Sequence, residues 1–314
     1  MSRLFAALDG GGSFSRAVLF DAAGTVISRA EGGPVNPNDV GETESAAVLT
    51  AVLDRAGASR AEFIFCGLAG AIGHETALAN EIKTAFPAAQ VCVKSDIFNL
   101  LSYLPGDDGA ALICGTGSVC FVKKAGELSR IGGWGWLIDG DCGGGFALGR
   151  AGLELALRAI DGREPGTALG REAEEFLGGR PDIELGKIYS GGRSFIASFA
   201  PRVVSAAAEG DQAAKGAVRR VASGVAEYLS AASAILGEGF DCVCGGGLFR
   251  EEYFRGAFLK SVALRGIRVG VDFVSAPGAA GAARAALREA GIAPEPGFDE
   301  RFIKTYREAG SDGR

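Results

Sequence analysis

Two stretches of the chain repeat one pattern, LFAALDGGGSFSRAVLFD at residues 4–21 and ALICGTGSVCFV at residues 111–122. Each is an apolar run, a glycine turn that carries a hydroxyl, and a second apolar run, which is typical of a β-hairpin. The length of 314 residues suits two domains better than one. A hairpin that recurs further along such a chain predicts that each domain is a copy of one plan.

The spacing of apolar residues predicts the same order of elements in both copies. The first copy has expected strands at 3–8, 16–21, 25–29, 61–67 and 90–94 and helices at 43–56, 75–86 and 96–103. The pattern restarts at Ala110, with strands at 111–114, 119–124 and near Ser129, and helices at 146–160, 167–177, 185–190, 193–209 and 211–236. A strand at 240–245, a helix at 250–260, a strand at 267–273 and helices at 277–291 and 298–308 complete it. We therefore predict an α/β protein with domains at 1–108 and 109–296, and a C-terminal helix, 297–310, that packs back on the first.

Composition excludes several classes of partner. The net charge is −6 and no run of Lys and Arg occurs, which argues against nucleic acid and against an anionic membrane surface. No run of eighteen apolar residues exists, and the apolar stretch after Met1 is too short for a secretory signal. The seven cysteines form no CxxC pair and there is one histidine, so we expect a cytoplasmic protein with reduced thiols and no structural zinc.

The two hairpin turns are candidate phosphate loops, because consecutive glycines let backbone N–H groups converge on an anion. The first turn comprises Asp9, Gly10, Gly11, Gly12 and Ser13, and the second Gly115, Thr116, Gly117 and Ser118. Two such turns that face each other across a cleft would grip the phosphates of one nucleotide from both sides. Asp9, at a strand end, can hold Mg²⁺, through water. The alternatives are an ordinary hairpin in which Asp9 caps its own turn, and a coincidental repeat.

A third glycine cluster ends the strand at 240–245. Such a loop at the carboxyl end of a strand lets a ribose or a ring lie against bare backbone, or serves close packing alone. Its residues are Gly245, Gly246 and Gly247. No GxxxxGK[ST] occurs and GGGSFS does not satisfy GxGxxG, so a Walker P-loop and a dinucleotide fingerprint are both excluded.

Asp96 is the candidate general base. It follows the strand VCVK and opens a helix, which puts its carboxylate at a strand end. Phosphoryl transfer depends mainly on positioning and charge neutralisation, so one carboxylate that deprotonates the acceptor hydroxyl suffices. The alternative role is that of an N-cap for the following helix, and the two roles are compatible.

The order of motifs over nearly the whole chain resembles the sugar-kinase branch of the actin/hexokinase/Hsp70 superfamily. It is similar above all to the N-acetylglucosamine kinase and BadF/BadG/BcrA/BcrD-type ATPase group. The motifs, in order, are DGGGS, EGGPVN, FCGLAG, SD, GTGS, GGWG, GDCGGGFALGR, VCGGGLF and PGAAGAARAAL.

The resemblance implies two ribonuclease-H-like domains (the actin-like ATPase fold) with ATP and substrate in an interdomain cleft. It implies a cytoplasmic homodimer, Mg²⁺, phosphate loops at DGGGS and GTGS, an adenosine loop at VCGGG and Asp96 as the base. The positions that match sugar contacts are Asn36, Asp96, Gly132, Gly133 and Asp141. Because the phosphate loops belong to different domains, ATP and sugar together are expected to compact the molecule in small-angle scattering.

One loop departs from the family pattern. Where relatives have roughly GGWGxLLGDEGSG, this chain has GGWGWLIDGDCGGGF, so that one residue is extra and Cys142 replaces a glutamate. Asp141 matches the family aspartate, although Asp139 fits with another placement of the insertion. Cysteine accepts hydrogen bonds weakly, which leaves the identity of the sugar open. Trp134 and Trp136 either stack on a sugar or pin the loop to the core.

The sequence leaves three functions to weigh. The first is an ATP-dependent kinase that phosphorylates the 6-hydroxyl of N-acetylglucosamine or a relative such as glucosamine or N-acetylmuramic acid. The second is an ATPase that activates an acyl-CoA dehydratase or reductase through an iron–sulfur cluster, for which Cys142 is a candidate ligand and absorbance near 400 nm a test. The third is a regulator that binds nucleotide without catalysis, which ADP formation with any sugar would exclude.

Overall fold

The computed structural model describes residues 3–138 and 143–309. The chain divides into two compact units, unit 1 with Met1–Tyr103 and Ser275–Arg314, and unit 2 with Leu104–Val274. None of the helices in the described ranges is both long enough and apolar enough to span a membrane.

Unit 1 is built on a five-stranded sheet in the order β3-β2-β1-β4-β5. The strands are β1 (Leu4–Gly10), β2 (Ser15–Asp21), β3 (Val26–Gly32), β4 (Phe63–Leu68) and β5 (Gln90–Ser95). β2 is antiparallel to β1 and to β3, whereas β1, β4 and β5 are mutually parallel. Gly10, Leu68 and Ser95 lie in register at the carboxyl ends of the three parallel strands. The segments that follow β1 and β5 therefore meet at one edge of this sheet.

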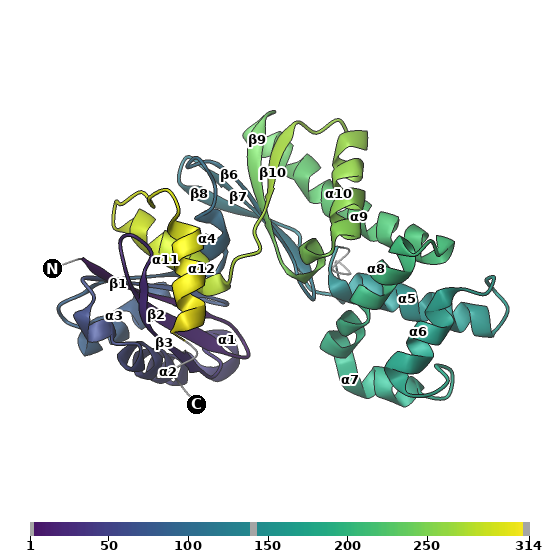
Figure 1. Ribbon diagram of the computed structural model, residues 1–314, viewed down its shortest axis with the longest axis horizontal. Coiled ribbons are helices and arrows are strands. Elements are labelled where there is room, and N and C mark those ends of the chain that lie inside the picture. The colour runs from purple at the N-terminus through teal and green to yellow at the C-terminus, as the bar shows by residue number, and fades with distance from the viewer. Residues whose placement is uncertain (1–2, 139–142, 310–314) are drawn as a thin grey trace. The chain divides into compact units, whose positions relative to one another are not determined.

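Helices cover both faces of this sheet. Successive side chains of β1 point to opposite faces, and both sets are apolar, so each face must be covered. Ala6 and Leu8 belong to the apolar cluster under α2 (Glu42–Arg55) and α3 (Glu75–Ala85). Phe5 and Ala7 belong to the opposite cluster, under α11 (Gly278–Glu289) and α12 (Phe298–Glu308) (Figure 1). The remaining helices of the unit are short: α1 (Pro37–Val40), η1 (Ala58–Arg60) and α4 (Ile97–Leu101).

The position of α11 differs from the expected domain boundary. The predicted second domain, 109–296, includes residues 277–291, but the structure packs α11 on β1 and α4 within unit 1. The reason lies in its buried face, where small side chains let the helix backbone approach the sheet closely. These residues are Ala279, Ala280, Gly281, Ala282, Ala283, Ala285, Ala286 and Leu287.

The helix at the end of the chain is held on unit 1 by aromatic packing. Phe298 and Phe302 of α12 are fully buried, and each ring lies about edge-on to Phe20 of β2, at 6.2 and 6.1 Å between centroids. We predict that Phe302→Ala destabilises the protein by about 3–5 kcal/mol, because the cavity it leaves lies in a close-packed core. Thermal denaturation measures this loss. Phe14→Ala is the matched control, since that ring is 47% exposed, and an equal effect of the two changes would contradict the packing.

Unit 2 repeats the sheet of unit 1 strand for strand. Its order is β10-β9-β6-β7-β8, with β7 antiparallel to β6 and β8, and β6, β9 and β10 parallel. The strands are β6 (Gly109–Cys114), β7 (Ser118–Lys124), β8 (Glu127–Ile131), β9 (Phe240–Gly245) and β10 (Val269–Phe273). Read from β8, this is the order of unit 1 read from β3. The duplication that the two hairpins predict is therefore present in the fold.

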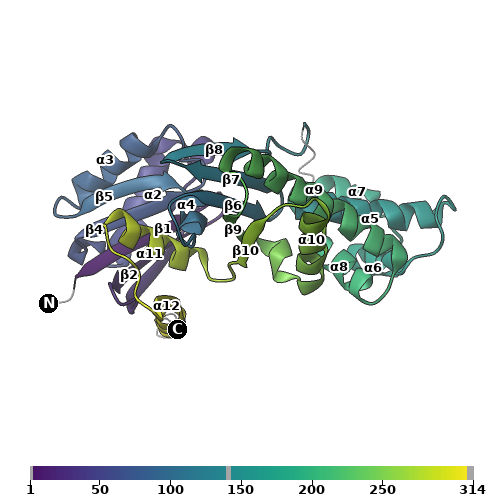
Figure 2. The ribbon, with the colours of Figure 1, turned by 90° about the horizontal axis from the view of Figure 1, so that it is seen from above.

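The helices of unit 2 include the longest helix of the described residues, α9 (Gln212–Leu236), which packs on β7 and β8. The others are α5 (Gly145–Ile160), α6 (Ala168–Leu177), α7 (Leu185–Ser198), α8 (Ala200–Ala208), η2 (Gly247–Arg250) and α10 (Glu252–Leu264). α5, α6, α7 and α8 pack together (Figure 2). The expected helix 193–209 is divided between α7 and α8, where Pro201 stands in the first turn of α8, and α7 is kinked at Gly192.

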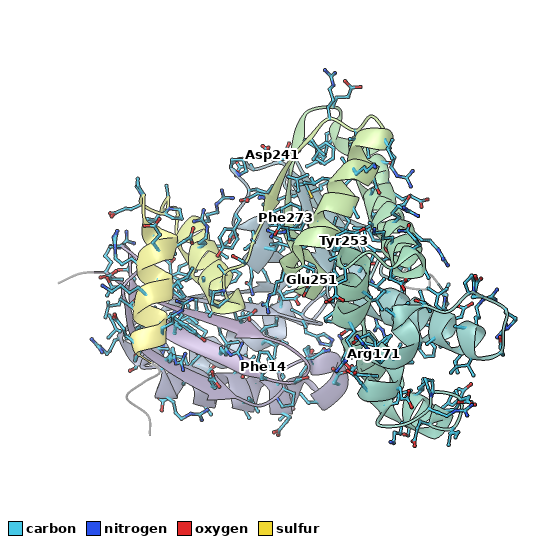
Figure 3. The ribbon with its side chains drawn as sticks, turned by 45° about the vertical axis from the view of Figure 1, so that its right-hand side comes forward. Phe14, Arg171, Asp241, Glu251, Tyr253 and Phe273 are labelled. Atoms are coloured by element: carbon cyan, nitrogen blue, oxygen red, sulfur yellow. The ribbon has the colours of Figure 1, made fainter. Side chains whose placement is uncertain are left out.

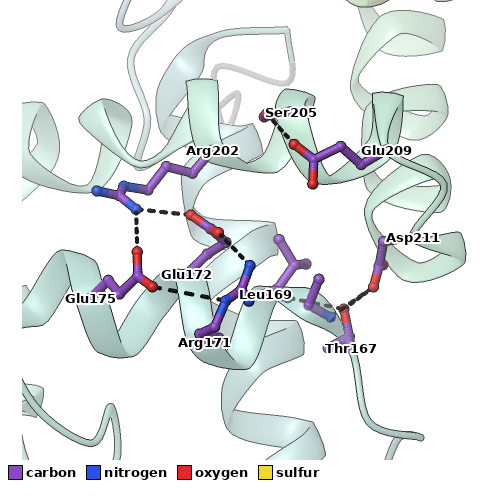
Figure 4. A network of polar contacts seen from close by, with 10 residues as sticks. Thr167, Leu169, Arg171, Glu172, Glu175, Arg202, Ser205, Glu209 and Asp211 are labelled. Atoms are coloured by element: carbon purple, nitrogen blue, oxygen red, sulfur yellow. Dashed lines mark hydrogen bonds and ion pairs between the residues drawn. The ribbon is translucent and has the colours of Figure 1, made fainter.

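Polar contacts link α6 with α8 and with the start of α9. Arg202 of α8 forms ion pairs with Glu172 and Glu175 of α6, at 2.8 and 3.6 Å (Figure 4). Asp211, the N-cap of α9, accepts a hydrogen bond of 2.7 Å from Thr167, which itself caps α6. These contacts fix the starts of two helices relative to each other and stabilise the region that supports the cavity described below.

Candidate active site

Two carboxylates lie at the carboxyl edge of the sheet in unit 1. Asp9 is the last residue but one of β1, and Asp96 directly follows β5. Burial raises the pKa of Asp9 above its ordinary value, a hydrogen bond from Asn99 opposes that rise, and the charge of Asp96 adds to it. The two acidic groups that the sequence singled out therefore share one electrostatic environment within this unit.

Asn99, which the sequence analysis did not single out, fixes the position of Asp9. Its Nδ2 donates a hydrogen bond of 2.7 Å to Asp9 Oδ1. Bare backbone makes room for the pair: a Cβ on Gly278 would lie 2.1 Å from Asp9 Oδ2, and one on Gly67 would lie 2.0 Å from Asn99 Oδ1. Asn99 stands one helical turn after Asp96, and that spacing was the available signal.

The carboxylate of Asp96 is not used as a helix cap. It makes no side-chain capping hydrogen bond to α4, although it precedes that helix. Burial raises its pKa above the ordinary value, while the Ser95 hydroxyl, which donates to Oδ1 over 3.2 Å, and the nearby N–H groups of Ile97 and Asp96 oppose the rise. Asp96 therefore makes no N-cap hydrogen bond to α4, although the N–H of Ile97, the first residue of that helix, lies close to its carboxylate.

The first glycine turn presents open backbone next to these carboxylates. Gly11 N donates to Phe14 O over 3.0 Å and closes the turn, and Gly12 and Ser13 are exposed. Asn36 belongs to an adjoining polar cluster. Its side chain accepts from Asn38 N at 3.1 Å and donates to Asp39 at 2.7 Å, so that it caps the short helix α1.

The second glycine turn, in unit 2, carries the start of α5. Gly145 N and Phe146 N donate to Gly115 O and Thr116 O, each over 2.8 Å, which satisfies two N–H groups that a helix start leaves without an intrahelical partner. Thr116 is exposed, but Ser118 is buried, and its hydroxyl contacts Tyr228 OH at 3.1 Å. Ser118 thus holds the turn in place, and Thr116 is the hydroxyl of this turn that faces solvent.

A cavity of about 430 Å³ in unit 2 brings two of the predicted loops together. The turn at 115–118 and the cluster at 245–247 both contribute to its walls, through Gly115, Thr116 and Gly247. The polar side chains of the same cavity were not predicted from the sequence; they come from α7, from the last residue of η2 and from Glu251 between η2 and α10 (labelled in Figure 3). They are Ser194, Ser198, Arg250 and Glu251. The only sequence signal was proximity to GGGLF for the last two.

Neighbouring glycines of the third cluster differ in what they tolerate. Gly246 has φ +107°, and a Cβ there would lie 2.3 Å from Cys114 O, whereas Gly247 has nothing within 4 Å. We predict that Gly246→Ala lowers the melting temperature, because backbone strain and a backbone clash coincide. Gly247→Ala is expected to leave the melting temperature unchanged, because the added methyl group meets open space. Differential scanning calorimetry measures both melting temperatures, and equal values for the two variants would contradict this prediction.

The first two glycines of the GGWG loop pack closely against other residues of unit 2. Gly132 and Gly133 have φ values of +67° and +69°, and a Cβ on Gly132 would lie 2.5 Å from the ring of Tyr228. Trp134 lies 4.7 Å from the Arg130 guanidinium, and Trp136 packs edge-on against Phe146 at 5.5 Å. Both indoles remain about half exposed, at 61% and 45%. Asp139, Asp141 and Cys142 lie outside the described residues.

The family follows from comparison of the sequence. The model of the BadF/BadG/BcrA/BcrD ATPase family matches residues 8–288. The chain belongs to this family. The resemblance that the motif order indicates is therefore confirmed.

Among the residues that the structure describes, no group of three or more His, Cys, Asp or Glu side chains is arranged to hold a metal ion.

Two curated relatives match parts of the chain. An N-acetylmuramic acid/N-acetylglucosamine kinase from Clostridium acetobutylicum is 30% identical over 68% of this chain and 74% of its own length. A glucosamine kinase from Vibrio cholerae is 29% identical over 52% of this chain and 58% of its own length.

Solved structures share the fold along their whole length. A putative N-acetylglucosamine kinase from Chromobacterium violaceum has a TM-score of 0.69 and 25% identity, with 91% of this chain and 99% of the other covered. A ROK family glucokinase from Streptomyces griseus has a TM-score of 0.61 and 19% identity, with 90% and 98% covered. The predicted fold class, two α/β units of the actin-like ATPase type, is confirmed.

Proposed function

We propose that the protein transfers the γ-phosphoryl group of ATP to the 6-hydroxyl of an amino sugar, N-acetylglucosamine or a close relative such as glucosamine or N-acetylmuramic acid. The names of its curated relatives support the class of substrate. The observation that carries the proposal is the pair of partly buried carboxylates, Asp9 and Asp96, at the carboxyl edge of the sheet in unit 1. Phosphoryl transfer requires one group to take a proton and another to organise the metal–phosphate charge.

In this proposal Asp96 acts on the sugar. Its carboxylate accepts the proton of the 6-hydroxyl while that oxygen forms a bond to the γ-phosphorus. The bond between this phosphorus and the oxygen that bridges to the β-phosphate breaks, and ADP leaves with the bridging oxygen. The proton passes from Asp96 to solvent after the products dissociate. A raised pKa suits this role, because a base works best when its pKa lies near the operating pH.

Asp9 is the candidate ligand for the magnesium ion of MgATP. Its donor atoms fit the ion, since Mg²⁺ prefers carboxylate and water oxygens and keeps several of its waters. Asn99 holds Asp9 Oδ1 at 2.7 Å and so fixes the direction of the carboxylate. We propose that Asp9 binds the ion through water. The ion, when bound, neutralises charge on the phosphates.

The cavity of unit 2 supports a nucleotide function for that unit. Its bare glycine backbone and its size, about 430 Å³, suit a ligand with a flat ring and a ribose. We propose that the turn at 115–118 and the cluster at 245–247 bind ATP together with the turn at 10–13. Contacts with the sugar are proposed for Asn36, Gly132, Gly133 and Asp141, as the family motifs imply.

The pH dependence of turnover follows from the raised pKa of Asp96. The base must be ionised, so activity falls as the pH drops through its pKa. Because burial raises that pKa above the ordinary 3.8, the acid limb of kcat/KM is expected at a pH higher than an exposed aspartate would give. A pH profile with saturating ATP measures this limb. Activity that is unchanged down to pH 4 would contradict the assignment.

A coupled assay of ADP release tests the proposed function. N-acetylglucosamine, glucosamine and N-acetylmuramic acid are compared with glucose, which lacks the 2-amino group and is the matched control. We expect at least one hexosamine to accelerate ADP release well above the rate with ATP alone and above the rate with glucose. Release of ADP that no sugar accelerates would contradict the proposal.

A further inference from the structure

Tyr228 contacts two of the segments that the proposed function assigns in unit 2, the GGWG loop at Gly132 and the GTGS turn at Ser118. It stands on α9 and is 6% exposed. Val225, one turn earlier on α9, packs against the backbone at Gly143, where a Cβ would lie 2.3 Å from Val225 Cγ2. The sequence alone gives Tyr228 no role, since a tyrosine on a helix face is usually a core residue.

The ring of Tyr228 packs against Gly132, in the loop that is proposed to bind the sugar. Gly132 has φ +67°, and a Cβ at this position would lie 2.5 to 2.8 Å from three atoms of the tyrosine ring and hydroxyl. Arg130 Nε donates to Gly132 O over 3.0 Å and holds the same residue from the other direction. The backbone of Gly132 therefore rests directly on the ring, and a movement of this loop displaces the ring or is blocked by it.

The hydroxyl of Tyr228 contacts Ser118, in the turn that is proposed to bind ATP. It lies 3.1 Å from Ser118 Oγ, and Ser118 Oγ accepts a hydrogen bond of 3.2 Å from Gly143 N. The segment that starts at Gly143 is in turn fixed to the second glycine turn, because a Cβ on Gly144 would lie 2.5 Å from Gly117 Cα. One side chain thus contacts the GGWG loop through its ring and the GTGS turn through its hydroxyl.

We propose that Tyr228 is a positioning residue that couples the binding of the sugar to the binding of ATP. This inference rests on the proposed function. A sugar bound on Gly132 and Gly133 holds the ring, the ring holds its hydroxyl on Ser118, and Ser118 fixes the turn that receives the phosphates. Each ligand then finds the other's loop already ordered and binds more tightly.

Calorimetric titration tests the coupling in Tyr228→Phe. A non-hydrolysable ATP analogue is titrated with and without N-acetylglucosamine, or the hexosamine that gives the fastest turnover, and the sugar is titrated with and without the analogue. In the wild type each ligand is expected to tighten the other about 5- to 150-fold. Loss of one hydrogen bond is expected to reduce this factor about fivefold, with the affinity for either ligand alone nearly unchanged.

Two further variants make the result decisive. Ser118→Ala removes the other partner of the same hydrogen bond, and the double variant is expected to lose no more coupling than either single variant. Tyr189→Phe is the matched control, since that tyrosine is 82% exposed, and it is expected to keep the wild-type factor. An undiminished factor in Tyr228→Phe, or a wild type in which neither ligand affects the other, would overturn the inference. If the coupling is absent but the protein still phosphorylates a hexosamine, only this inference is wrong and the proposed function stands. If no hexosamine is phosphorylated, the proposed function itself is wrong.

Discussion

Asp96→Asn is expected to lower kcat for sugar phosphorylation about 10²- to 10⁴-fold, because the amide cannot accept the proton of the acceptor hydroxyl. The KM values for sugar and ATP are expected to change little, since asparagine occupies nearly the same volume and still accepts a hydrogen bond. The coupled assay of ADP release measures both parameters. A variant that retains wild-type kcat would remove Asp96 from the role of base.

The stability of this variant provides an independent check. The folded-state pKa of Asp96 is raised, so its protonation favours the folded state at low pH, and that contribution is lost as the pH rises through the folded pKa. Asparagine carries no charge to bury, and at neutral pH Asp96→Asn is expected to melt at or above the wild-type temperature. Asp241→Asn, at an exposed position of β9 (labelled in Figure 3), is the matched control and is expected to keep full activity. A large fall in the melting temperature of Asp96→Asn would point to a structural role.

Gly278→Ala is expected to lower kcat about 10²-fold without any change in a charged group. Its Cβ would lie 2.1 Å from Asp9 Oδ2, so the carboxylate must rotate away from the position that Asn99 gives it. A displacement of about 1 Å in a group that organises the phosphates is enough for a loss of this size. Steady-state kinetics measures the loss, and a dependence on Mg²⁺ concentration shifted to higher values would identify Asp9 as the affected group.

Gly216→Ala on α9 is the matched control for this substitution. Nothing lies within 4 Å of the position that its Cβ would take. Alanine is favoured over glycine inside a helix by about 0.5–1 kcal/mol, so this variant is expected to be slightly more stable and fully active. Equal kinetics for Gly278→Ala and Gly216→Ala would contradict the proposed role of Asp9.

Much of the fold is local and was therefore visible in the sequence. The two hairpins, β1–β2 and β6–β7, are marked by glycine turns between apolar runs, and most helices by their periodicity. The exceptions have physical reasons. α1, Pro37–Val40, is too short to show a period. The apolar spacing predicts one helix over 193–209, although Pro201 marks the first turn of a separate helix, α8. The placement of α11 depends on contacts with strands far away in the chain, and a face made almost wholly of alanine does not reveal which sheet it covers.

The site was predictable where a residue type and a strand end coincide, and less so elsewhere. Asp9 and Asp96 stand out in the sequence because each carboxylate directly adjoins a buried strand end. The burial of Ser118 depends on Tyr228, which lies far along the chain on α9, so the turn GTGS alone gave no sign that this hydroxyl faces inward. Ser194 and Ser198 reach the cavity only because α7 and α8 pack against α5, which no local pattern reports.

The identity of the product tests the central claim most directly. The protein is incubated with MgATP and the hexosamine that gives the fastest turnover, and the sugar product is examined by ³¹P and ¹H NMR. The account predicts a phosphomonoester whose phosphorus couples to the two protons on carbon 6, formed in equal amount with ADP. ADP that accumulates with inorganic phosphate, or a phosphorus that couples to the proton on carbon 1, would contradict it.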